Sequence, residues 1–303
     1  MKRILICGSN GLLGQRLSLL LNKQTDAEVL STSHHRSFVF DRQLFDYTQL
    51  DITKKGDVKS LISSFQPTVI INAAAATNVD WCESNREAAW KANVTGVENL
   101  MEACRKVDAK LVHVSTDYVF DGKGGPYDEL ARPNPISYYG KTKLAGENAV
   151  RASGIPHAIV RTIVVYGYGV DVKENFALWV INSLREGKKI RCVNDQVSNP
   201  TYVTDLAQAI IRIIELQREG TYHVCGSEHL SRYDFAVRAA NVFALSPDLI
   251  TPVPSAVLNQ PAPRPMVTGF ITLKAETELG VQMRDTTSGL ELLKSELFDT
   301  RRN

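Results

Sequence analysis

Apolar segments of strand length alternate with segments of helical periodicity through the first half of the chain. Five apolar segments are predicted to form buried strands: Arg3–Cys7, Glu28–Thr32, Val69–Asn72, Lys110–Ser115 and His157–Arg161. Four other segments repeat their apolar residues at helical spacing and are predicted to be helices: Leu12–Leu21, Lys54–Phe65, Asn85–Val107 and Ser137–Ala152. Because this alternation is typical of a parallel sheet covered on both faces, the sequence predicts an α/β fold with a Rossmann-type doubly wound parallel sheet.

The pattern becomes less regular after Tyr166. Three helices and one clear strand are predicted there: Asn175–Glu186, Val203–Arg218, Arg232–Phe243 and the strand Thr221–Cys225. Six prolines between Ser246 and Pro265 predict an irregular excursion. We therefore predict a dinucleotide-binding domain over residues 1–165 and a smaller C-terminal α/β lobe for the substrate over residues 166–303. Part of the segment 195–230, which holds the Thr221 strand, is expected to return to the main sheet.

The charge balance excludes some classes of partner. The 303 residues carry 35 basic and 33 acidic side chains, so neither nucleic acid nor an anionic membrane is expected to bind. No stretch approaches the roughly 18 apolar residues of a membrane span, and the first apolar run is too short for a signal peptide. The five cysteines are scattered without the spacing of a zinc site or a C-x-x-C pair. We expect a reduced, cytoplasmic protein without a protein-bound metal.

A glycine-rich turn joins the first predicted strand to the first predicted helix. It reads Gly8-Ser9-Asn10-Gly11-Leu12-Leu13-Gly14, a G-x-x-G-x-x-G spacing. The first glycine permits a tight turn, the second a close approach of the backbone to a pyrophosphate, and the third close packing of helix on strand. The helix N-terminus adds unpaired N–H donors and a positive dipole end. The residues expected to contact a dinucleotide here are Gly8, Asn10, Gly11, Leu12, Leu13 and Gly14.

The residues after the second predicted strand indicate which nicotinamide cofactor binds. An NAD site usually has an aspartate or glutamate here to bind the adenosine ribose. The segment Ser31–Arg36 instead ends in two histidines and Arg36, with no carboxylate. Because an arginine fork matches a 2′-phosphate in charge and geometry, we favour NADPH and keep NADH as the alternative. In the competing interpretation, Arg36 caps a solvated loop that also contains His34 and His35.

One tyrosine–lysine pair has the spacing of an acid–base couple. Of the ten tyrosines, only Tyr139 is followed by a lysine four residues later, Lys143, on the same face of the predicted helix. A phenol with a pKa of about 10 is a poor proton donor unless its anion is stabilised, here by the ammonium and an oxidised nicotinamide. Thr116 follows the strand Lys110–Ser115 at the sheet edge where ligands bind. We expect Thr116 to polarise a carbonyl that Tyr139 protonates; the plainer interpretation of Thr116 is a turn cap.

Two longer motifs resemble a known family. The segments Ser115–Gly122 (Ser-Thr-Asp-Tyr-Val-Phe-Asp-Gly) and Tyr139–Glu147 (Tyr-Gly-Lys-Thr-Lys-Leu-Ala-Gly-Glu) are similar to motifs of the dTDP-4-dehydrorhamnose reductases, within the extended short-chain dehydrogenase/reductase superfamily. Further matches span essentially the whole chain: Asn72–Ala75, Val79-Asp80, Asn93, Arg161, Asp195-Gln196, Pro200–Val203 and Arg264-Pro265. One departure stands out, because the family's Arg-Pro-x-Asn-Ser reads Arg264-Pro265-Met266-Val267-Thr268 here. It leaves the sugar and the nucleotide open.

The resemblance implies roles for individual residues. Thr116, Tyr139 and Lys143 are implied to be the catalytic trio, and Lys143 is also implied to bind the nicotinamide ribose. Asp51 and Ile52 are implied to approach the adenine. The remaining implied contacts are Ala73, Ala74, Ala75 and Asn93 for the cofactor, and Thr116, Asp117, Tyr202 and Arg264 for the substrate. Arg264 is expected to hold the anionic diphosphate in its planar fork.

The function that the resemblance implies is NADPH-dependent reduction of the C4 ketone of a nucleotide-activated 6-deoxysugar, dTDP-4-dehydro-L-rhamnose to dTDP-L-rhamnose. Two alternatives stay open. One is a cofactor-binding regulatory subunit, because the β subunit of methionine adenosyltransferase is similar in its Tyr-Gly-Lys-Thr-Lys stretch. The other is a related GDP- or UDP-sugar reductase or epimerase. The resemblance also admits a homodimer and bound Mg²⁺, although the carboxylates that hold magnesium in some relatives are not matched here.

Several other conspicuous side chains are interpreted as structural. Four aromatic residues fall on predicted helix faces and are expected in the core: Trp90, Phe176, Trp179 and Phe235. His113 lies in the middle of a predicted strand and is expected to be packed there. The sequence therefore predicts ligand contacts chiefly at strand ends and not on these helices.

Overall fold

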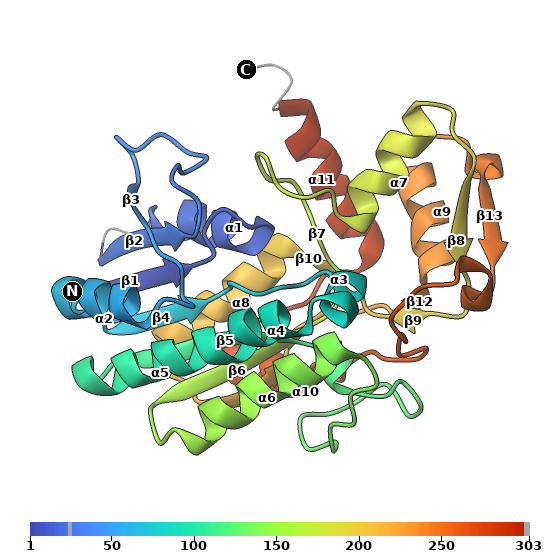
Figure 1. The fold of residues 1–303 in the computed structure, drawn as a ribbon. Coiled ribbons are helices and arrows are strands. Elements are labelled where there is room, and N and C mark those ends of the chain that lie inside the picture. The colour runs from blue at the N-terminus through green and yellow to red at the C-terminus, as the bar shows by residue number, and fades with distance from the viewer. Residues whose placement is uncertain (24–25, 300–303) are drawn as a thin grey trace.

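A seven-stranded sheet forms the larger part of the structure, a computed structural model that describes residues 1–23 and 26–299 (Figure 1). In spatial order the strands are β11 (Gly220–His223), β6 (His157–Thr162), β5 (Lys110–Thr116), β4 (Val69–Asn72), β1 (Lys2–Cys7), β2 (Ala27–Ser33) and β3 (Asp46–Gln49). Every neighbouring pair is parallel. The predicted Rossmann-type parallel sheet is confirmed, and the five strands predicted in the first half match to within one residue at each end.

Alternate residues of the central strand β1 face two separate apolar layers. Ile4 and Ile6 pack with α1 (Leu12–Leu21), α8 (Val203–Glu215) and α10 (Leu273–Leu279). Leu5 and Cys7 pack with the opposite layer, which contains α2 (Lys55–Phe65), α5 (Gly96–Val107) and α6 (Tyr138–Ala152). All four side chains are at most 1% exposed. Because each such burial contributes about 1.5–3 kcal/mol, the strand is fixed from both faces.

The strand order reverses between β1 and β4. The chain runs from β1 to β2 and β3 on one side, and β4, β5 and β6 follow on the other. Cys7 at the end of β1 is paired with Asn72 at the end of β4, so the loops after both strands leave the same sheet edge side by side. In open α/β sheets this switch point is where ligands bind.

The predicted helix Asn85–Val107 is not one regular helix. Arg86–Trp90 (α4) is followed by a π-helical turn, Lys91–Thr95, and only then by α5. A separate short helix, α3 (Val79–Ser84), comes before them. The π-helical turn widens the helix by one residue around Asn93, and such turns frequently occur at functional sites.

The smaller lobe packs its helices against short strands, and Figure 1 shows α7, α9, β8 and β13 together at the right. Its helices are α7 (Phe176–Arg185), α9 (Arg232–Val242) and α11 (Thr286–Asp299). Its strand pairs are β8 (Ile190–Val193) with β13 (Ile250–Val253), β7 (Val165–Tyr166) with β10 (Thr201–Tyr202), and β9 (Val197–Ser198) with β12 (Leu230–Ser231). The proline-rich stretch predicted to be irregular thus contains a strand, because Ile250 is buried and pairs with Ile190.

The chain crosses between its two parts several times. Strand β11 pairs with β6 at the edge of the main sheet, and α8 packs under it. Helix α10 also covers the main sheet through Ala275 and Leu279, although it comes late in the sequence. The larger part is therefore completed by segments from the second half of the chain. Among the described residues, no helix is long and apolar enough to cross a membrane.

Candidate active site

The glycine turn after β1 is closed to side chains at two positions. Gly8 has a φ of +85°, and a Cβ there would lie 2.7 Å from the amide nitrogen of Ala74. A Cβ on Gly14 would lie 2.2 Å from the carbonyl oxygen of Gly8. Both positions need glycine, because the turn is pressed between the loop after β4 and the first turn of α1.

The N-terminus of α1 is left available to an anion. Gly11 is its N-cap, so within the described structure no side chain caps this helix, and its first turn holds no acidic residue. The Ser9 hydroxyl and the Asn10 side-chain oxygen are buried there without a hydrogen-bond partner among the described residues. Free N–H groups at a helix N-terminus suit a pyrophosphate, so the predicted contacts at Gly8 to Gly14 fit a dinucleotide.

The loop after β2 is held beside this turn. The side-chain amide of Asn10 donates to the Ser37 carbonyl at 2.9 Å, and the Tyr47 hydroxyl donates to the His35 carbonyl at 2.5 Å. Arg36 lies between these two anchors and is exposed. The loop therefore presents an unshielded guanidinium next to the predicted pyrophosphate site, where a 2′-phosphate would need it.

Asp51 and Ile52 follow β3 at the same end of the sheet. The Asp51 carboxylate accepts from the backbone N–H and the hydroxyl of Thr53, at 2.9 and 2.8 Å. Burial would raise the pKa of Asp51, but these hydrogen bonds outweigh it and lower the pKa. The Ile52 side chain is buried against Gly96, where a Cβ would lie 2.8 Å from it. Asp51 is thus the half-buried, charged member of the pair, and Ile52 is the buried, apolar one.

The loop after β4 connects the glycine turn to helix α6. Ala73, Ala74 and Ala75 are half-buried, and Ala73 and Ala74 contact Gly8 as described above. The next residue, Ala76, is held at both backbone groups by Asn93, which accepts from its N–H at 2.8 Å and donates to its carbonyl at 3.1 Å. The position of Ala73 to Ala75 next to the phosphate turn fits the predicted cofactor lining.

Asn93, which is predicted to contact the cofactor, has its side-chain amide engaged within the protein. Its side chain is 1% exposed, and its amide also donates to the Thr142 hydroxyl at 3.0 Å. That hydroxyl in turn donates to the Tyr139 carbonyl at 2.8 Å. The π-helical turn points the Asn93 amide toward these groups, so Asn93 joins the loop after β4 to helix α6 and uses both of its side-chain N–H donors there.

The predicted catalytic trio comes together at the carboxyl edge of the sheet. Thr116 ends β5, and Tyr139 and Lys143 lie one turn apart on α6, whose N-cap Ser137 accepts from the Gly140 N–H at 3.1 Å. The Thr116 hydroxyl lies close enough to the phenol of Tyr139 to lower its pKa. Helix α6 packs tightly here, because a Cβ on Gly140 would lie 2.1 Å from the Tyr118 carbonyl oxygen.

The pKa of Tyr139 departs from the expected direction. Burial raises the pKa of the phenol above its usual range, and the nearby Thr116 hydroxyl lowers it only in part. The Lys143 ammonium was expected to lower this pKa, but it donates to the Val114 carbonyl at 2.7 Å. Burial therefore holds Tyr139 as the neutral phenol, the form that can donate a proton.

Lys143 is itself a perturbed group. Burial lowers its pKa to about 8, and the negative charge of Glu147 opposes that shift. Glu147 lies one turn further along α6 and binds the buried Arg161 at 2.9 and 2.7 Å. Burial would raise the pKa of Glu147, but Arg161 outweighs it and lowers the pKa to about 2. Strongly shifted pKa values in one cluster are typical of functional sites.

Asp117 was predicted to contact the substrate, yet its carboxylate is engaged within the protein. It accepts from the Thr116 hydroxyl at 3.1 Å and from the Thr268 hydroxyl at 2.8 Å. Burial raises its pKa. Thr268 stands where the resembled motif has serine, so the hydroxyl that holds Asp117 is retained. Asp117 therefore acts on Thr116, whose hydroxyl it holds, and is a positioning residue.

A cleft opens between this site and the smaller lobe. Tyr118 lines its inner end, and the lobe contributes two groups of side chains: the aromatic Phe176 and Trp179, and the basic Arg191, Arg232 and Arg264. Phe176 and Trp179 pack against the core of the smaller lobe, as predicted, and also line the cleft, while Phe235 is buried as expected. Trp90 is 44% exposed, so the core prediction was wrong for that residue. Sequence periodicity cannot separate a cleft wall from a core face, because both are apolar.

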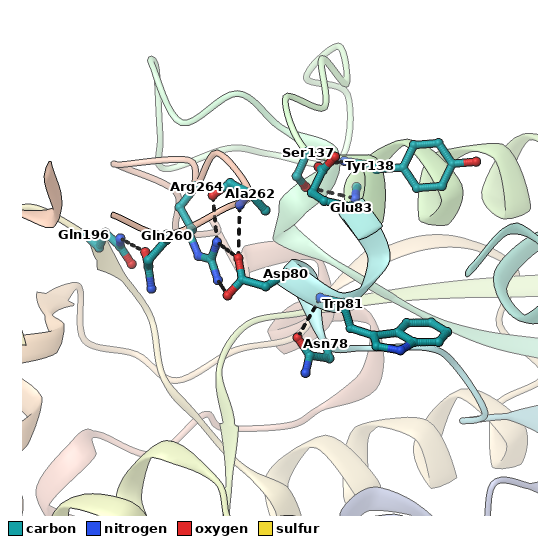
Figure 2. Close-up of polar contacts among 11 residues, drawn as sticks. Asn78, Asp80, Trp81, Glu83, Ser137, Tyr138, Gln196, Gln260, Ala262 and Arg264 are labelled. Atoms are coloured by element: carbon teal, nitrogen blue, oxygen red, sulfur yellow. Dashed lines mark hydrogen bonds and ion pairs between the residues drawn. The ribbon is translucent and has the colours of Figure 1, made fainter. Parts of the chain in front are cut away.

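Arg264, the predicted diphosphate contact, is already paired. Figure 2 shows its guanidinium against Asp80 of α3, with N–O distances of 2.6 and 2.7 Å, and the Ala262 N–H also donates to Asp80, at 3.0 Å. Burial lowers the pKa of Arg264, but Asp80 outweighs this and raises it. Arg264 therefore ties the smaller lobe to the larger part at the cleft, instead of presenting a free fork.

Tyr202, the other predicted substrate contact, lies elsewhere. It is 4% exposed in the apolar cluster of the smaller lobe, and its hydroxyl donates to Glu296 of α11 at 2.8 Å. The structure does not bring it together with Arg264. No local pattern around Tyr202 in the sequence indicates that the distant helix α11 covers it.

Comparisons with known proteins agree with this arrangement. A family model described as RmlD substrate binding domain matches residues 1–297. The chain belongs to this family, that of the dTDP-4-dehydrorhamnose reductases. A dTDP-4-dehydrorhamnose reductase of Aggregatibacter actinomycetemcomitans is 35% identical, covering 97% of this chain and 99% of that protein. The crystal structure of a dTDP-4-dehydrorhamnose reductase from Bacillus anthracis in complex with NADP is 32% identical, with a TM-score of 0.84, covering 98% of this chain and 100% of that one.

The family likeness extends to a protein with another name. Methionine adenosyltransferase 2 subunit beta of Xenopus tropicalis is 34% identical, covering 83% of this chain and 75% of that protein. The predicted resemblance to the reductase family is confirmed, and the similarity to this β subunit is real as well. Within residues 1–23 and 26–299, no group of three or more His, Cys, Asp or Glu side chains could hold a metal ion.

Proposed function

We infer that the chain is an NADPH-dependent reductase of the C4 ketone of a nucleotide-activated 6-deoxysugar, dTDP-4-dehydro-L-rhamnose, with dTDP-L-rhamnose as the product. One observation carries this inference. Tyr118 lines the cleft and packs edge-on against Tyr139, with ring centroids 5.5 Å apart. Tyr118 therefore connects the cleft to Tyr139, whose phenol would be the proton donor for a carbonyl oxygen bound there.

Cofactor binding is assigned to the residues that fit a dinucleotide. Gly8 to Gly14 would hold the pyrophosphate, Arg36 the 2′-phosphate, Asp51 and Ile52 the adenosine, and Ala73 to Ala75 with Lys143 the nicotinamide end. The buried, unpartnered oxygens of Ser9 and Asn10 support this assignment. NADPH, when bound, supplies the hydride. The relative solved with NADP supports the preference for NADPH, and NADH is kept as the alternative cofactor.

The protein's own residues supply the proton. Reduction of a ketone adds one hydride to the carbonyl carbon and one proton to its oxygen, and Tyr139 donates that proton. The Thr116 hydroxyl donates its single hydrogen to Asp117, and in this proposal it turns that hydrogen to the same carbonyl oxygen when the substrate binds. Lys143 gives one of its three N–H donors to the Val114 carbonyl, and in this proposal its remaining donors and its charge stabilise the phenolate left behind. A solvent proton restores the phenol. Because burial keeps Tyr139 protonated before the reaction, the acid is in place when the carbonyl arrives.

The division of labour between the two parts belongs to the same proposal. Residues 1–165, with the segments that return to the sheet, bind the cofactor, and the smaller lobe binds the sugar nucleotide through the cleft. A cytoplasmic location and a homodimer are proposed with it. Cell fractionation and analytical ultracentrifugation test these two points.

The deciding experiment is a substrate panel. NADPH oxidation is followed with dTDP-4-dehydro-L-rhamnose and with 4-keto sugars carried on GDP and UDP. The proposal expects turnover with the dTDP sugar at the highest kcat/KM. Preference for a GDP or UDP sugar would reassign the substrate, and product formation without net NADPH oxidation would indicate an epimerase.

A regulatory role is the second candidate, and the 34% identity to methionine adenosyltransferase 2 subunit beta favours it. That role predicts cofactor binding without reductase turnover, together with a stable complex with a methionine adenosyltransferase. Size-exclusion chromatography of the two proteins mixed, with and without NADPH, separates the candidates. Turnover of a keto sugar without co-elution of the two proteins would support the reductase function and exclude the regulatory role.

A further inference from the structure

The cleft has a basic wall that the net charge of the chain does not reveal. Arg191 comes from β8, Arg232 from the start of α9, and Arg264 from the loop before α10. The chain carries a net charge of only +2, so three arginines around one cleft are a local concentration. Such a cluster favours an anionic ligand, and the three side chains differ in how far they are already neutralised.

Most N–H donors of the Arg264 guanidinium that could bind an anion are already used within the protein. Asp80 accepts from two of its nitrogens, at 2.6 and 2.7 Å, and the Ala262 carbonyl accepts from it at 2.7 Å. An anionic ligand could bind Arg264 only by displacing Asp80 and breaking the contact between the two parts of the chain (Figure 2). The charges of Arg264 and Asp80 thus neutralise each other within the protein.

Arg232 has the opposite character. Among residues 1–23 and 26–299 its guanidinium makes no hydrogen bond or ion pair; it lies over the Phe176 ring, 5.0 Å from the centroid. The nearby carboxylate of Asp117 is taken up by Thr116 and Thr268. Burial lowers the pKa of Arg232, and the charge of the Asp117 carboxylate offsets that effect only in part. A half-buried, unpaired arginine at a cleft is costly to keep unless an anion binds it.

The neighbours of Arg232 fix the direction of a bound ligand. Phe176, which lies under the Arg232 guanidinium, is stacked with Trp179 at a centroid distance of 5.7 Å, and both rings line the cleft. At the inner end, Tyr118 leads to Tyr139. A nucleoside diphosphate sugar has the same order of parts, with the base at one end, the charged diphosphate in the middle and the reacting sugar at the other.

We propose that Arg232, and not Arg264, is the arginine that binds the diphosphate of the sugar nucleotide. Its planar fork can hold two phosphate oxygens at once, while Phe176 keeps the guanidinium in place. Exposed Arg191 adds charge at the rim. Arg264 remains bound to Asp80 and acts as a tie between the two parts. This assignment rests on the proposed function for the identity of the ligand.

Binding of two probes to the intact protein tests the assignment without turnover. Isothermal titration measures the Kd of dTDP and of thymidine, which lacks the phosphates, for wild type, Arg232→Gln, Arg232→Lys and Arg264→Gln. Arg238→Gln is the matched control, because Arg238 lies on the same helix α9 but is paired with Glu228 and Thr287. Thermal unfolding of each variant without ligand checks that it is folded.

The expected result is specific to the phosphates. Arg232→Gln raises the Kd of dTDP by about 10- to 100-fold, the range for a lost charge-assisted contact, and leaves the Kd of thymidine within about twofold of the wild-type value. Arg232→Lys, which keeps the charge but not the fork, falls between wild type and Arg232→Gln. Arg238→Gln changes neither Kd. Arg264→Gln changes the Kd of dTDP and the Kd of thymidine by the same factor, because it weakens the contact with Asp80 that holds the two parts of the chain together.

Three outcomes overturn the assignment: dTDP binding unchanged in Arg232→Gln, an equal loss of dTDP and thymidine in that variant, or a phosphate-specific loss in Arg264→Gln instead. A wild type that does not bind dTDP also overturns it. If wild type binds dTDP through Arg232 but does not oxidise NADPH, the proposed reductase function fails and this assignment stands.

Discussion

The ring of Tyr118 meets the ring of Tyr139 edge-on, with centroids 5.5 Å apart and an interplanar angle of 68°. Tyr118 lines the cleft of the smaller lobe, whereas Tyr139 sits above the end of β5 with Thr116. Gly140 presses against the Tyr118 backbone, so the two rings cannot drift apart. This contact joins the proposed substrate cleft to the proposed proton donor.

Gly14→Ala is predicted to weaken cofactor binding. A Cβ at this position would lie 2.2 Å from the Gly8 carbonyl oxygen, so the glycine turn must move. We expect the Kd for NADPH to rise at least about tenfold, which corresponds to about 1.4 kcal/mol. Gly56→Ala in α2 is the matched control, since no described atom lies within 4 Å of its Cβ. This control should stabilise the helix by about 0.5–1 kcal/mol and leave the Kd alone. An unchanged Kd in Gly14→Ala would place the pyrophosphate elsewhere.

Arg36→Ala is predicted to reduce the preference for NADPH. The exposed guanidinium would lose its contact with the 2′-phosphate, and NADH has no phosphate to lose. The KM for NADPH should rise about tenfold or more, and the KM for NADH should change little. Arg42→Ala is the control on the same loop, because Arg42 bonds the Tyr47 carbonyl at 2.8 Å. If the ratio of the two KM values is the same in wild type and Arg36→Ala, Arg36 has no part in selecting the cofactor.

Asn93→Ala is predicted to lower kcat as well as stability. It leaves the Ala76 N–H and the Thr142 hydroxyl without their buried partner, at a cost of about 1–3 kcal/mol in the free energy of unfolding. Because Thr142 also holds the Tyr139 carbonyl, helix α6 loses its register against the loop after β4. Chemical denaturation measures the first effect and steady-state kinetics, well below the unfolding temperature, the second. A loss of stability with full kcat would limit Asn93 to a structural role.

The pH dependence of kcat/KM is predicted to follow Lys143. Burial lowers its pKa to about 8, so the ammonium is present below that pH and is lost as the pH rises through it. Activity that needs the ammonium should therefore decline above a pH of about 8. The charge of Glu147 opposes the lowering of this pKa, so Glu147→Gln should move the decline to lower pH.

The Glu147→Gln variant also carries a stability cost that must be measured beside the profile. It leaves Arg161 buried without a carboxylate, which costs about 3–5 kcal/mol. Glu102→Gln is the control, because this glutamate binds Lys55 and Lys106 on the surface. A decline that stays at the same pH in Glu147→Gln, with the protein folded, would show that Lys143 does not set it.

The sequence alone predicted the features that local chemistry determines. The apolar runs of β1, β4, β5 and β6 can be buried only as central strands, and the G-x-x-G-x-x-G turn requires glycine for steric reasons that hold in any context. The i, i+4 spacing placed Tyr139 and Lys143 on one face of a helix. Strand β3 was missed because Tyr47 is its only buried residue, so it has no apolar run to detect.

The features that sequence reasoning missed depend on contacts between distant segments. Arg264 is paired with Asp80, which lies 184 positions earlier, and no local pattern shows that its fork is taken. The π-helical turn at Asn93 is set by hydrogen bonds to Ala76 and Thr142, not by helix propensity. Arg232 carries no motif at all. It became a candidate only when the structure placed it at the cleft without a partner.

The most direct test of the account is Tyr139→Phe, which removes the phenolic O–H and leaves the ring packed against Tyr118. Turnover of the preferred 4-keto sugar nucleotide and the Kd for NADPH are measured on the same preparation. The account predicts a fall in kcat of about 10²- to 10⁴-fold, the usual share of a general acid, with the Kd for NADPH unchanged. A variant that binds NADPH normally and turns over at close to the wild-type rate would contradict it.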